Sequence, residues 1–287
     1  MTELCQILYS EEYSSTMSAL RSLLEQKLYT EEALLLTEKA LDLLASHYTT
    51  WHYRFDIVKH LQKDLFEELD WCEEIALENQ KNYQIWNYRQ RIIEEIMQNA
   101  DLADKFQHKR EHPILDMMLQ QDPKNHHVWS YRKWFVERFG LHNDEAELTF
   151  TTKLIDTDAR NNSAWTHRFF LKFKGGNILE KDIQEEFEYV KLQIDLCPQN
   201  PSTWNYLSGI ISETGKNLVE FKNFCLVYGD LQSKVISSSF ALEMLAKIAI
   251  LEGNTSEADG IYDALSSTYD PIRKNYWAYL QAKLGSK

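Results

Sequence analysis

Basic side chains and histidines concentrate in two short segments of an otherwise acidic chain. Residues 81–91 hold three cations and no acid, and residues 124–142 hold four cations and three histidines against one acid. The cations are Lys81, Arg89, Arg91, Lys124, Arg132, Lys133 and Arg138. If the two segments form equivalent turns of adjacent hairpins, Lys81 and Lys124 stand side by side, and two neighbouring cations suit a phosphate or carboxylate ligand. Charge alone leaves the alternative of solvated loop lysines equally open.

Other chemical signatures are weak or absent. His108 and His112 have the i,i+4 spacing of zinc-binding helices, but Pro113 follows them and Lys109 occupies the position of the zinc-protease glutamate. We therefore expect no metal site in this chain. The sequence contains no phosphate-binding glycine loop, nucleophile elbow or dinucleotide fingerprint. By itself the chain has no complete catalytic set.

A tryptophan-centred repeat organises the chain around the basic segments. The pattern N-x-x-x-W-x-x-R occurs five times, three times in full, with Trp-to-Trp spacings of 35, 43, 36 and 39 residues. The repeated tryptophans are Trp51, Trp86, Trp129, Trp165 and Trp204. Self-similarity at such periods indicates a repeat architecture.

Each copy of the pattern predicts a helical hairpin. An amphipathic stretch such as 65–76 precedes the motif, and a short polar connection such as 122–125 ends the first helix. The motif asparagine suits the N-cap of the second helix, because its side chain accepts an unpaired backbone N–H. Tryptophan and arginine at i,i+3 share one helix face. We expect the tryptophans to fill gaps between stacked hairpins and the arginines to bind carbonyls or carboxylates of neighbouring loops.

The composition agrees with a fold made of helices. Nine glycines and five prolines are about 5% of 287 residues, where average usage is about 12%. We predict an all-α, right-handed superhelical crescent, which is an α-solenoid of stacked hairpins. The prediction is a single domain over 1–287, with an N-terminal helical extension (1–30), five repeats (31–215) and degenerate C-terminal hairpins (216–287). The apolar face of the last helix is expected to consist of Tyr276, Tyr279, Leu280 and Leu284.

Charge, hydropathy and cysteine usage exclude several classes of protein. The formal net charge of −13 argues against a nucleic-acid partner, which needs clustered Lys and Arg over a broad surface. No stretch approaches 18 consecutive apolar residues, and residues 1–10 lack signal-peptide features, so we expect no membrane insertion and no secretion. The four cysteines form no C-x-x-C pair and fit the reduced thiols of a cytoplasmic protein.

The motifs, in this order, resemble those of protein prenyltransferase α subunits, the chain shared by farnesyltransferase and geranylgeranyltransferase type I. The densest match lies within 48–86, the segment 270–277 resembles the family's final helix, and the likeness covers nearly the whole chain. The resemblance implies a crescent wrapped around a separate β subunit that holds the catalytic zinc. Such a heterodimer transfers a farnesyl or geranylgeranyl group from its diphosphate to the cysteine of a C-terminal CaaX motif in proteins such as small GTPases. Isoprenoid choice, X-residue preference and any magnesium requirement depend on the β subunit.

The resemblance assigns roles to residues around the first two motif turns. Lys81 matches the family lysine that contacts the isoprenoid diphosphate, where a cation stabilises charge on the leaving group. Gln84 matches the glutamine that binds the C-terminal carboxylate of the CaaX peptide. Tyr83 matches a position near the same site, and Tyr48 matches a tyrosine near the peptide groove.

Further residues are assigned in the third motif turn. Asn125 matches a position near the site, and His127 matches a histidine near the diphosphate. Lys124 takes the place equivalent to Lys81 in the next hairpin and supplies a second cation. His126 replaces the tyrosine that the family usually has here, and the sequence leaves open whether it keeps a hydrogen-bonding role.

Two alternatives stay open at this level. The Rab-type geranylgeranyltransferase α subunit shares the tryptophan repeats, but it commonly carries extra domains that 287 residues do not hold. A non-catalytic adaptor of the tetratricopeptide kind would use a concave helical surface to bind a segment of another protein. Its regular 34-residue period is absent here.

Overall fold

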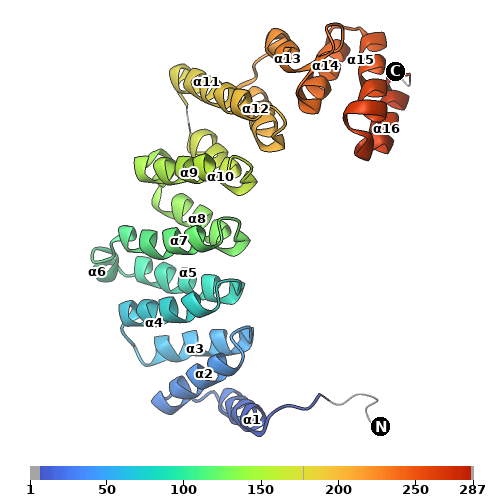
Figure 1. The fold of residues 1–287 in the computed structure, drawn as a ribbon. Helices are drawn as coiled ribbons and strands as arrows, with labels where there is room; N and C mark the ends of the chain where they lie inside the picture. The colour runs from blue at the N-terminus through green and yellow to red at the C-terminus, as the bar shows by residue number, and fades with distance from the viewer. Residues whose placement is uncertain (1–6, 177, 286–287) are drawn as a thin grey trace. The chain divides into compact units, whose positions relative to one another are not determined.

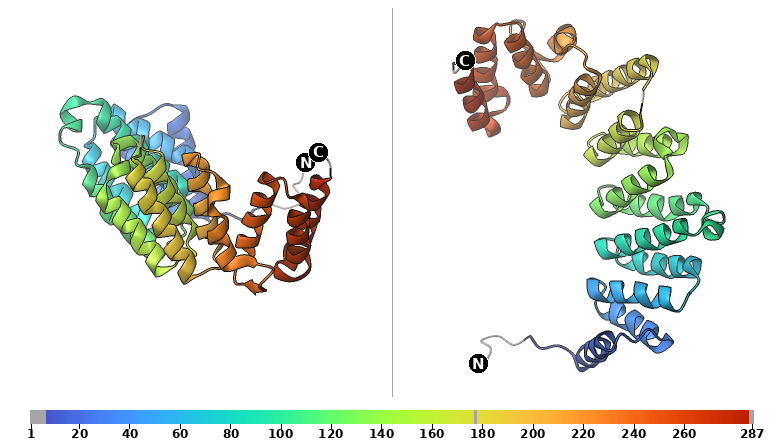
Figure 2. Two further views of the ribbon diagram at one scale, coloured as in Figure 1. Left: turned by 90° about the horizontal axis from the view of Figure 1, so that it is seen from above. Right: turned by 180° about the vertical axis from the view of Figure 1, so that it is seen from behind.

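The computed structural model describes residues 7–176 and 178–285, and helices joined by short turns make up most of them (Figure 1). The chain divides into two compact units, Met1–Phe139 and Gly140–Lys287. Each unit stacks helical hairpins, as further views show (Figure 2), which confirms the predicted all-α fold. The single domain with one continuous curvature stays a prediction. Residues 1–6 of the expected N-terminal extension lie outside the described residues.

The first unit contains three motif hairpins. A leading helix α1 packs on α2, and the second helices of successive hairpins, α3, α5 and α8, pack side by side in chain order. The hairpins are α2/α3, α4/α5 and α7/α8, with a short helix α6 and a 3₁₀ turn η1 between the last two. The elements are α1 (Glu11–Glu25), α2 (Glu31–Leu43), α3 (Tyr48–His60), α4 (Leu65–Glu78), α5 (Tyr83–Gln98), α6 (Ala100–Ala103), η1 (His108–Arg110), α7 (Glu111–Gln121) and α8 (His126–Phe139).

The second unit contains two motif hairpins, α9/α10 and α11/α12, followed by helices without the motif. Helix α12 contacts α14, which joins the motif hairpins to the C-terminal helices. The elements are η2 (Leu141–Asn143), α9 (Glu145–Thr157), α10 (Asn162–Phe173), α11 (Glu180–Leu196), α12 (Pro201–Thr214), η3 (Leu218–Phe221), α13 (Lys222–Gly229), β1 (Val235–Ile236), α14 (Ser239–Leu251), α15 (Thr255–Ala264), the π-helical turn η4 (Leu265–Tyr269), η5 (Pro271–Arg273) and α16 (Lys274–Leu284).

The motif asparagines cap the second helices, as predicted. Asn82, Asn125, Asn161 and Asn200 accept backbone N–H groups at the starts of α5, α8, α10 and α12. Three of their amide nitrogens also donate to the preceding turn: Asn82 to the Ala45 carbonyl at 2.6 Å, Asn125 to Gln80 at 3.0 Å and Asn200 to Ala159 at 2.6 Å. One side chain thus closes its own turn and fastens that turn to the previous hairpin.

The motif tryptophans fill the gaps between hairpins, as predicted. All five are buried. Three pack on a tyrosine of the next hairpin, with ring centroids about 5 Å apart: Trp51 on Tyr88 (4.9 Å), Trp86 on Tyr131 (5.0 Å) and Trp165 on Tyr206 (4.9 Å). Tilted pairs of this kind contribute roughly 0.5–1.5 kcal/mol beyond the burial of their area.

The motif arginines are buried and pair with acidic side chains of helices, whereas the sequence predicted partners in the neighbouring loops. Three of them pair with a buried glutamate on the first helix of the next hairpin: Arg54 with Glu68, Arg89 with Glu111 and Arg168 with Glu186. Each glutamate also accepts a phenol O–H from its own hairpin: Glu68 from Tyr88, Glu111 from Tyr131 and Glu186 from Tyr206. In the fourth hairpin His167 replaces the tyrosine, with its Nε2 3.2 Å from Glu147 Oε2. The arginines therefore join hairpins through their helices.

The last helix buries a different face from the one predicted. Trp277 is fully buried, whereas Tyr276 and Tyr279 are exposed. The Trp277 ring stacks on Tyr262 of α15 at 6.0 Å, and its indole N–H donates to the Asp270 carbonyl. One large side chain fixes the rotation of this short helix. Among the described residues, no helix combines the length and apolar character needed to cross a membrane.

Candidate functional site

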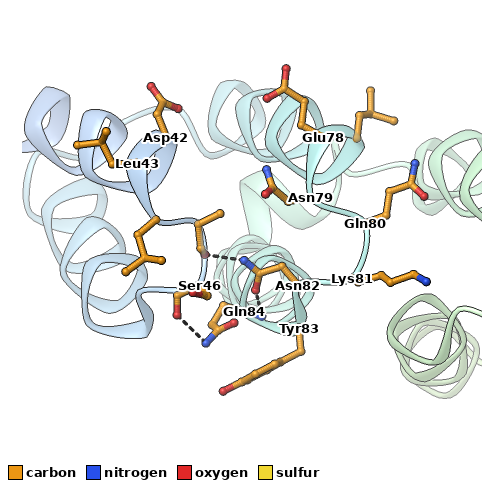
Figure 3. Close-up of a pocket in the computed structure, with 13 residues that line it drawn as sticks. Asp42, Leu43, Ser46, Glu78, Asn79, Gln80, Lys81, Asn82, Tyr83 and Gln84 are labelled. Atoms are coloured by element: carbon orange, nitrogen blue, oxygen red, sulfur yellow. Dashed lines mark hydrogen bonds between the residues drawn. The ribbon is translucent and has the colours of Figure 1, made fainter. Parts of the chain in front are cut away.

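The turns before α3, α5 and α8, together with the first residues of these helices, carry the predicted site residues. Contacts between successive turns bring these residues together. A hollow of about 810 Å³ lies between the first two turns and is lined by residues 42–46 and 77–84 (Figure 3). A second hollow of about 230 Å³ is lined by residues of α3 and α5, including Tyr48, Tyr83 and Gln84. Tyr83 and Gln84 line both hollows and mark where they meet.

Lys81 presents its ammonium group at the edge of the larger hollow. Its side chain is 78% exposed, and its Nζ lies 3.3 Å from Oδ2 of Asp122 in the next turn. The side chain extends away from Asp42 and Glu78, which lie across the hollow (Figure 3). An exposed pair of this kind holds the lysine weakly, so the cation is accessible to an anion that approaches this edge.

Gln84 is buried, unlike Lys81. It is 9% exposed, and its Nε2 donates to the Ser46 carbonyl of the previous turn at 3.0 Å (Figure 3). Asn82 accepts the Gln84 backbone N–H, which places the side chain at the start of α5. A primary amide carries two N–H donors, and one of them is used by Ser46. The remaining donor suits a carboxylate.

Tyr48, Tyr83 and His126 are the first residues of α3, α5 and α8, and all three side chains are exposed. The Tyr83 ring lies nearly parallel to the His127 ring, with centroids 6.4 Å apart, and His126 lies 5.5 Å from His127. Tyr48 lines the smaller hollow with Tyr83. The aromatic and imidazole groups thus form a surface that continues from the second turn to the third.

Asn125 and Lys124 differ in whether their side chains are accessible to a ligand. The Asn125 side chain is buried, its Oδ1 accepts the His127 N–H, and its Nδ2 donates to Gln80. Both ends of this amide are engaged within the protein, so Asn125 shapes the turns. Lys124 is exposed, and its backbone N–H donates to Asp122 Oδ1 at 3.2 Å.

The two basic segments supply fewer ligand-facing cations than their composition suggested. Arg89 and Arg132 are fully buried and paired with acids, and Arg138 bonds Glu94 at 3.0 Å. Arg91 lies over the Phe55 ring at 4.0 Å and lines the smaller hollow. Arg89 balances the buried Glu111 carboxylate and Arg132 pairs with the partly exposed Asp116, in keeping with the structural role expected of the motif arginines.

Sequence reasoning missed the buried glutamates and Asp122. A signal for the glutamates exists in the spacing, since each stands 18 residues before a motif tryptophan. The pairs are Glu68/Trp86, Glu111/Trp129, Glu147/Trp165 and Glu186/Trp204. Asp122 has no comparable signal, because only the packing of two turns places it beside Lys81.

The described residues show no metal centre. Within residues 7–176 and 178–285, no group of three or more His, Cys, Asp or Glu side chains is placed to hold a metal ion. The histidines with zinc-like spacing pack on aromatic rings instead: His108 lies 5.7 Å from Phe139, and His112 lies 5.4 Å from Phe135.

Comparisons with known proteins identify the repeat. The family model described as the protein prenyltransferase alpha subunit repeat matches residues 30–61, 65–96, 108–139, 144–171 and 183–214. A Candida albicans protein named farnesyltransferase/geranylgeranyltransferase type-1 subunit alpha is 53% identical over 99% of this chain and 93% of its own length. A Schizosaccharomyces pombe protein with the same name is 33% identical over 98% and 88%. A solved structure of Candida albicans geranylgeranyltransferase-I complexed with GGPP matches with a TM-score of 0.93 and 52% identity, covering 98% of this chain and 93% of that one.

Proposed function

The chain belongs to the protein prenyltransferase α-subunit family, and we propose that it acts with a β subunit to attach an isoprenoid to proteins. The heterodimer transfers a farnesyl or geranylgeranyl group from its diphosphate to the cysteine of a C-terminal CaaX motif, as in small GTPases. Support comes from relatives named for both activities and from a similar chain in a complex with GGPP. The β subunit selects the isoprenoid. A cytoplasmic location belongs to this proposal and rests on cysteine usage in the sequence.

The observation that carries the proposal is the Lys81–Tyr83–Gln84 cluster at the junction of two hollows. In the proposed reaction the cysteine sulfur bonds to the first carbon of the isoprenoid, the carbon–oxygen bond breaks, and diphosphate leaves. Lys81 contacts the diphosphate and stabilises the charge that grows on its oxygens. His127, beside Tyr83, adds a hydrogen-bond donor on the same side, and exposed Lys124 and His126 extend this surface.

The residues around the smaller hollow bind the peptide substrate in this proposal. Gln84 is held by Ser46, which directs its remaining N–H donor to the C-terminal carboxylate of the CaaX peptide. Tyr48 and Tyr83 flank the peptide beside the smaller hollow, while Asn125 keeps the two turns in register. A zinc ion in the β subunit would supply the cysteine as a thiolate. Any magnesium requirement follows from the β subunit as well.

The test is to purify the heterodimer and measure prenyl transfer with both isoprenoid diphosphates. Lys81→Ala should slow the chemical step in single-turnover experiments by about 2–4 kcal/mol of transition-state stabilisation. Lys39→Ala is the matched control, because Lys39 is also exposed and also lies 3.3 Å from a carboxylate, that of Glu12. An unchanged chemical step in Lys81→Ala removes Lys81 from catalysis. A chain that forms no complex with a zinc-containing β subunit would instead be a helical-repeat adaptor.

A further inference from the structure

The turn that carries Lys81 differs from its counterparts in how it is held. Four motif tryptophans donate their indole N–H to the carbonyl six residues earlier: Trp51 to Ala45 at 2.7 Å, Trp129 to Pro123 at 2.9 Å, Trp165 to Ala159 at 2.9 Å and Trp204 to Pro198 at 2.8 Å. In the described part of the chain, Trp86 Nε1 is buried without a hydrogen-bond partner. The turn 79–82 therefore lacks the indole tether that fixes the other motif turns.

The following segment, residues 121–125, contacts the Lys81 turn at several points. Asn125 Nδ2 donates to the Gln80 carbonyl at 3.0 Å, and the Gln80 side-chain amide donates to Gln121. Asp122 faces Lys81 at 3.3 Å. Segment 121–125 thus makes three contacts with the Lys81 turn: one to the Gln80 backbone, one to the Gln80 side chain and one to the Lys81 ammonium group. The turn that carries Lys81 is held by the next hairpin and, through Asn82, by the previous one, but not by its own tryptophan.

Asp122 is the member of this set that acts on the ammonium group itself. Its Oδ1 accepts the Lys124 backbone N–H at 3.2 Å, which fixes the carboxylate in its own turn, and Oδ2 lies beside Lys81. The Asp122 side chain is 33% exposed, against 78% for Lys81. The exposed pair is weak, so Asp122 biases the direction in which the Lys81 ammonium points and leaves it within reach of an anion.

We propose that Asp122 is a positioning residue that orients Lys81 for the isoprenoid diphosphate. The inference rests on the proposed role of Lys81 at the diphosphate. Asp122 does not contact the substrate, and its effect on the reaction passes through the lysine.

A purely structural role is the competing explanation, because turn-to-turn contacts recur in both units, as in the hydrogen bonds of Asn82 to Ala45 and of Asn200 to Ala159. Arg160 Nη2 lies 3.7 Å from Cys197 Sγ, and Gln199 exchanges two hydrogen bonds with Ser239. Those contacts join neighbouring turns without an ammonium–carboxylate pair. If the Lys81–Asp122 contact served only to join turns, its loss would lower stability without acting through Lys81.

The test is Asp122→Asn in the purified heterodimer, alone and combined with Lys81→Ala. Asparagine still accepts the Lys124 N–H, so the turn is kept while the charge is removed. We expect the single-turnover rate to fall roughly tenfold, because Lys81 would be less well oriented toward the diphosphate. The KM for the isoprenoid diphosphate should not rise, because removing a carboxylate reduces repulsion of the anion. In the Lys81→Ala background, Asp122→Asn should cause no further loss.

The outcomes separate this inference from the proposed function. An equal loss in both backgrounds, or no loss in the Asp122→Asn single variant, overturns the positioning role. A Lys81→Ala variant with an unchanged rate overturns the proposed function instead. Asp122→Glu should restore part of the rate, since it restores the charge. Glu12→Gln is the control, because it removes a carboxylate at the same 3.3 Å distance from another exposed lysine, Lys39.

Discussion

The guanidinium of Arg89 binds the carboxylate of Glu111 through two hydrogen bonds of 2.7 and 2.8 Å, and both side chains are fully buried. Arg89 belongs to one hairpin and Glu111 begins the next, so this pair joins the hairpins on which the candidate site residues lie. The Tyr131 phenol also donates a hydrogen bond to the Glu111 carboxylate at 2.8 Å. A buried ion pair contributes little beyond a well-packed apolar core, but removing one partner leaves a charge in a medium that solvates it poorly.

We therefore expect Glu111→Gln to be strongly destabilising. The change removes the buried counter-charge of Arg89 and leaves only the partly exposed Glu73 carboxylate at 3.3 Å. Losing one partner of a buried pair costs about 3–5 kcal/mol of unfolding free energy. Urea unfolding followed by circular dichroism measures this loss of unfolding free energy. The control is Glu95→Gln, which breaks the partly exposed pair with Lys59 and should cost less than about 1 kcal/mol. Similar losses for both variants would contradict the account of the buried pair.

The stability of the protein should fall at alkaline pH. Burial raises the pKa of Tyr88, Tyr131 and Tyr206 well above the ordinary value, and the carboxylates beside them add to the shift. In the unfolded chain these phenols titrate near about pH 10, so above that pH the unfolded state loses protons that the folded state keeps. The contribution of these phenols to the free energy of unfolding is complete below about pH 10. It is lost as the pH rises toward their pKa values in the folded protein.

Urea midpoints measured across this alkaline range check the prediction. Tyr131→Phe should make the decline shallower, because it removes one of the three phenols. Phenolate absorbance from these buried tyrosines in the still-folded protein would show that the raised pKa values are not a property of the native state.

Two cysteines should resist alkylation until the protein unfolds. Burial raises the pKa of the Cys72 and Cys225 thiols to about 12, and the thiolate is the reactive form. Iodoacetamide treatment near about pH 8, followed by peptide mass spectrometry, should modify both only in denaturant. Cys197 is partly exposed and serves as the reference thiol, while Cys5 lies outside the described residues. Rapid modification of Cys72 in the folded protein would contradict its burial.

Changes at Gln84 should act on the peptide substrate. Gln84→Ala removes a donor to a carboxylate, an interaction of about 1.5–3 kcal/mol, so the peptide KM should rise by roughly one to two powers of ten. Gln84→Glu should raise it further, because two carboxylates repel. The chemical step in saturating peptide should stay within about twofold. An unaltered peptide KM in both variants would remove Gln84 from the peptide site.

Local features of the sequence were sufficient to predict the helices and the residues that cap them. Asn82 and Asn200 cap helices because an amide oxygen meets the first unpaired N–H groups a few residues away. The burial of Trp51 and Trp165 followed from their recurrence in every repeat. The last helix shows where this reasoning failed, because periodicity offered several apolar faces and only packing against Tyr262 selected the one with Trp277.

The sequence by itself thus determined the hairpin repeat, with Lys81 and Lys124 in its turns and Gln84 at the start of a second helix. It did not determine which charges face a ligand, because that depends on partners distant in sequence. Arg89 is neutralised by Glu111, 22 residues away, and Lys81 is oriented toward Asp122 only because two turns pack together. Helix caps and periodicity act over one turn of chain, whereas burial of a charge is decided by the whole tertiary environment, since its energy depends on every neighbouring dipole and on the exclusion of water.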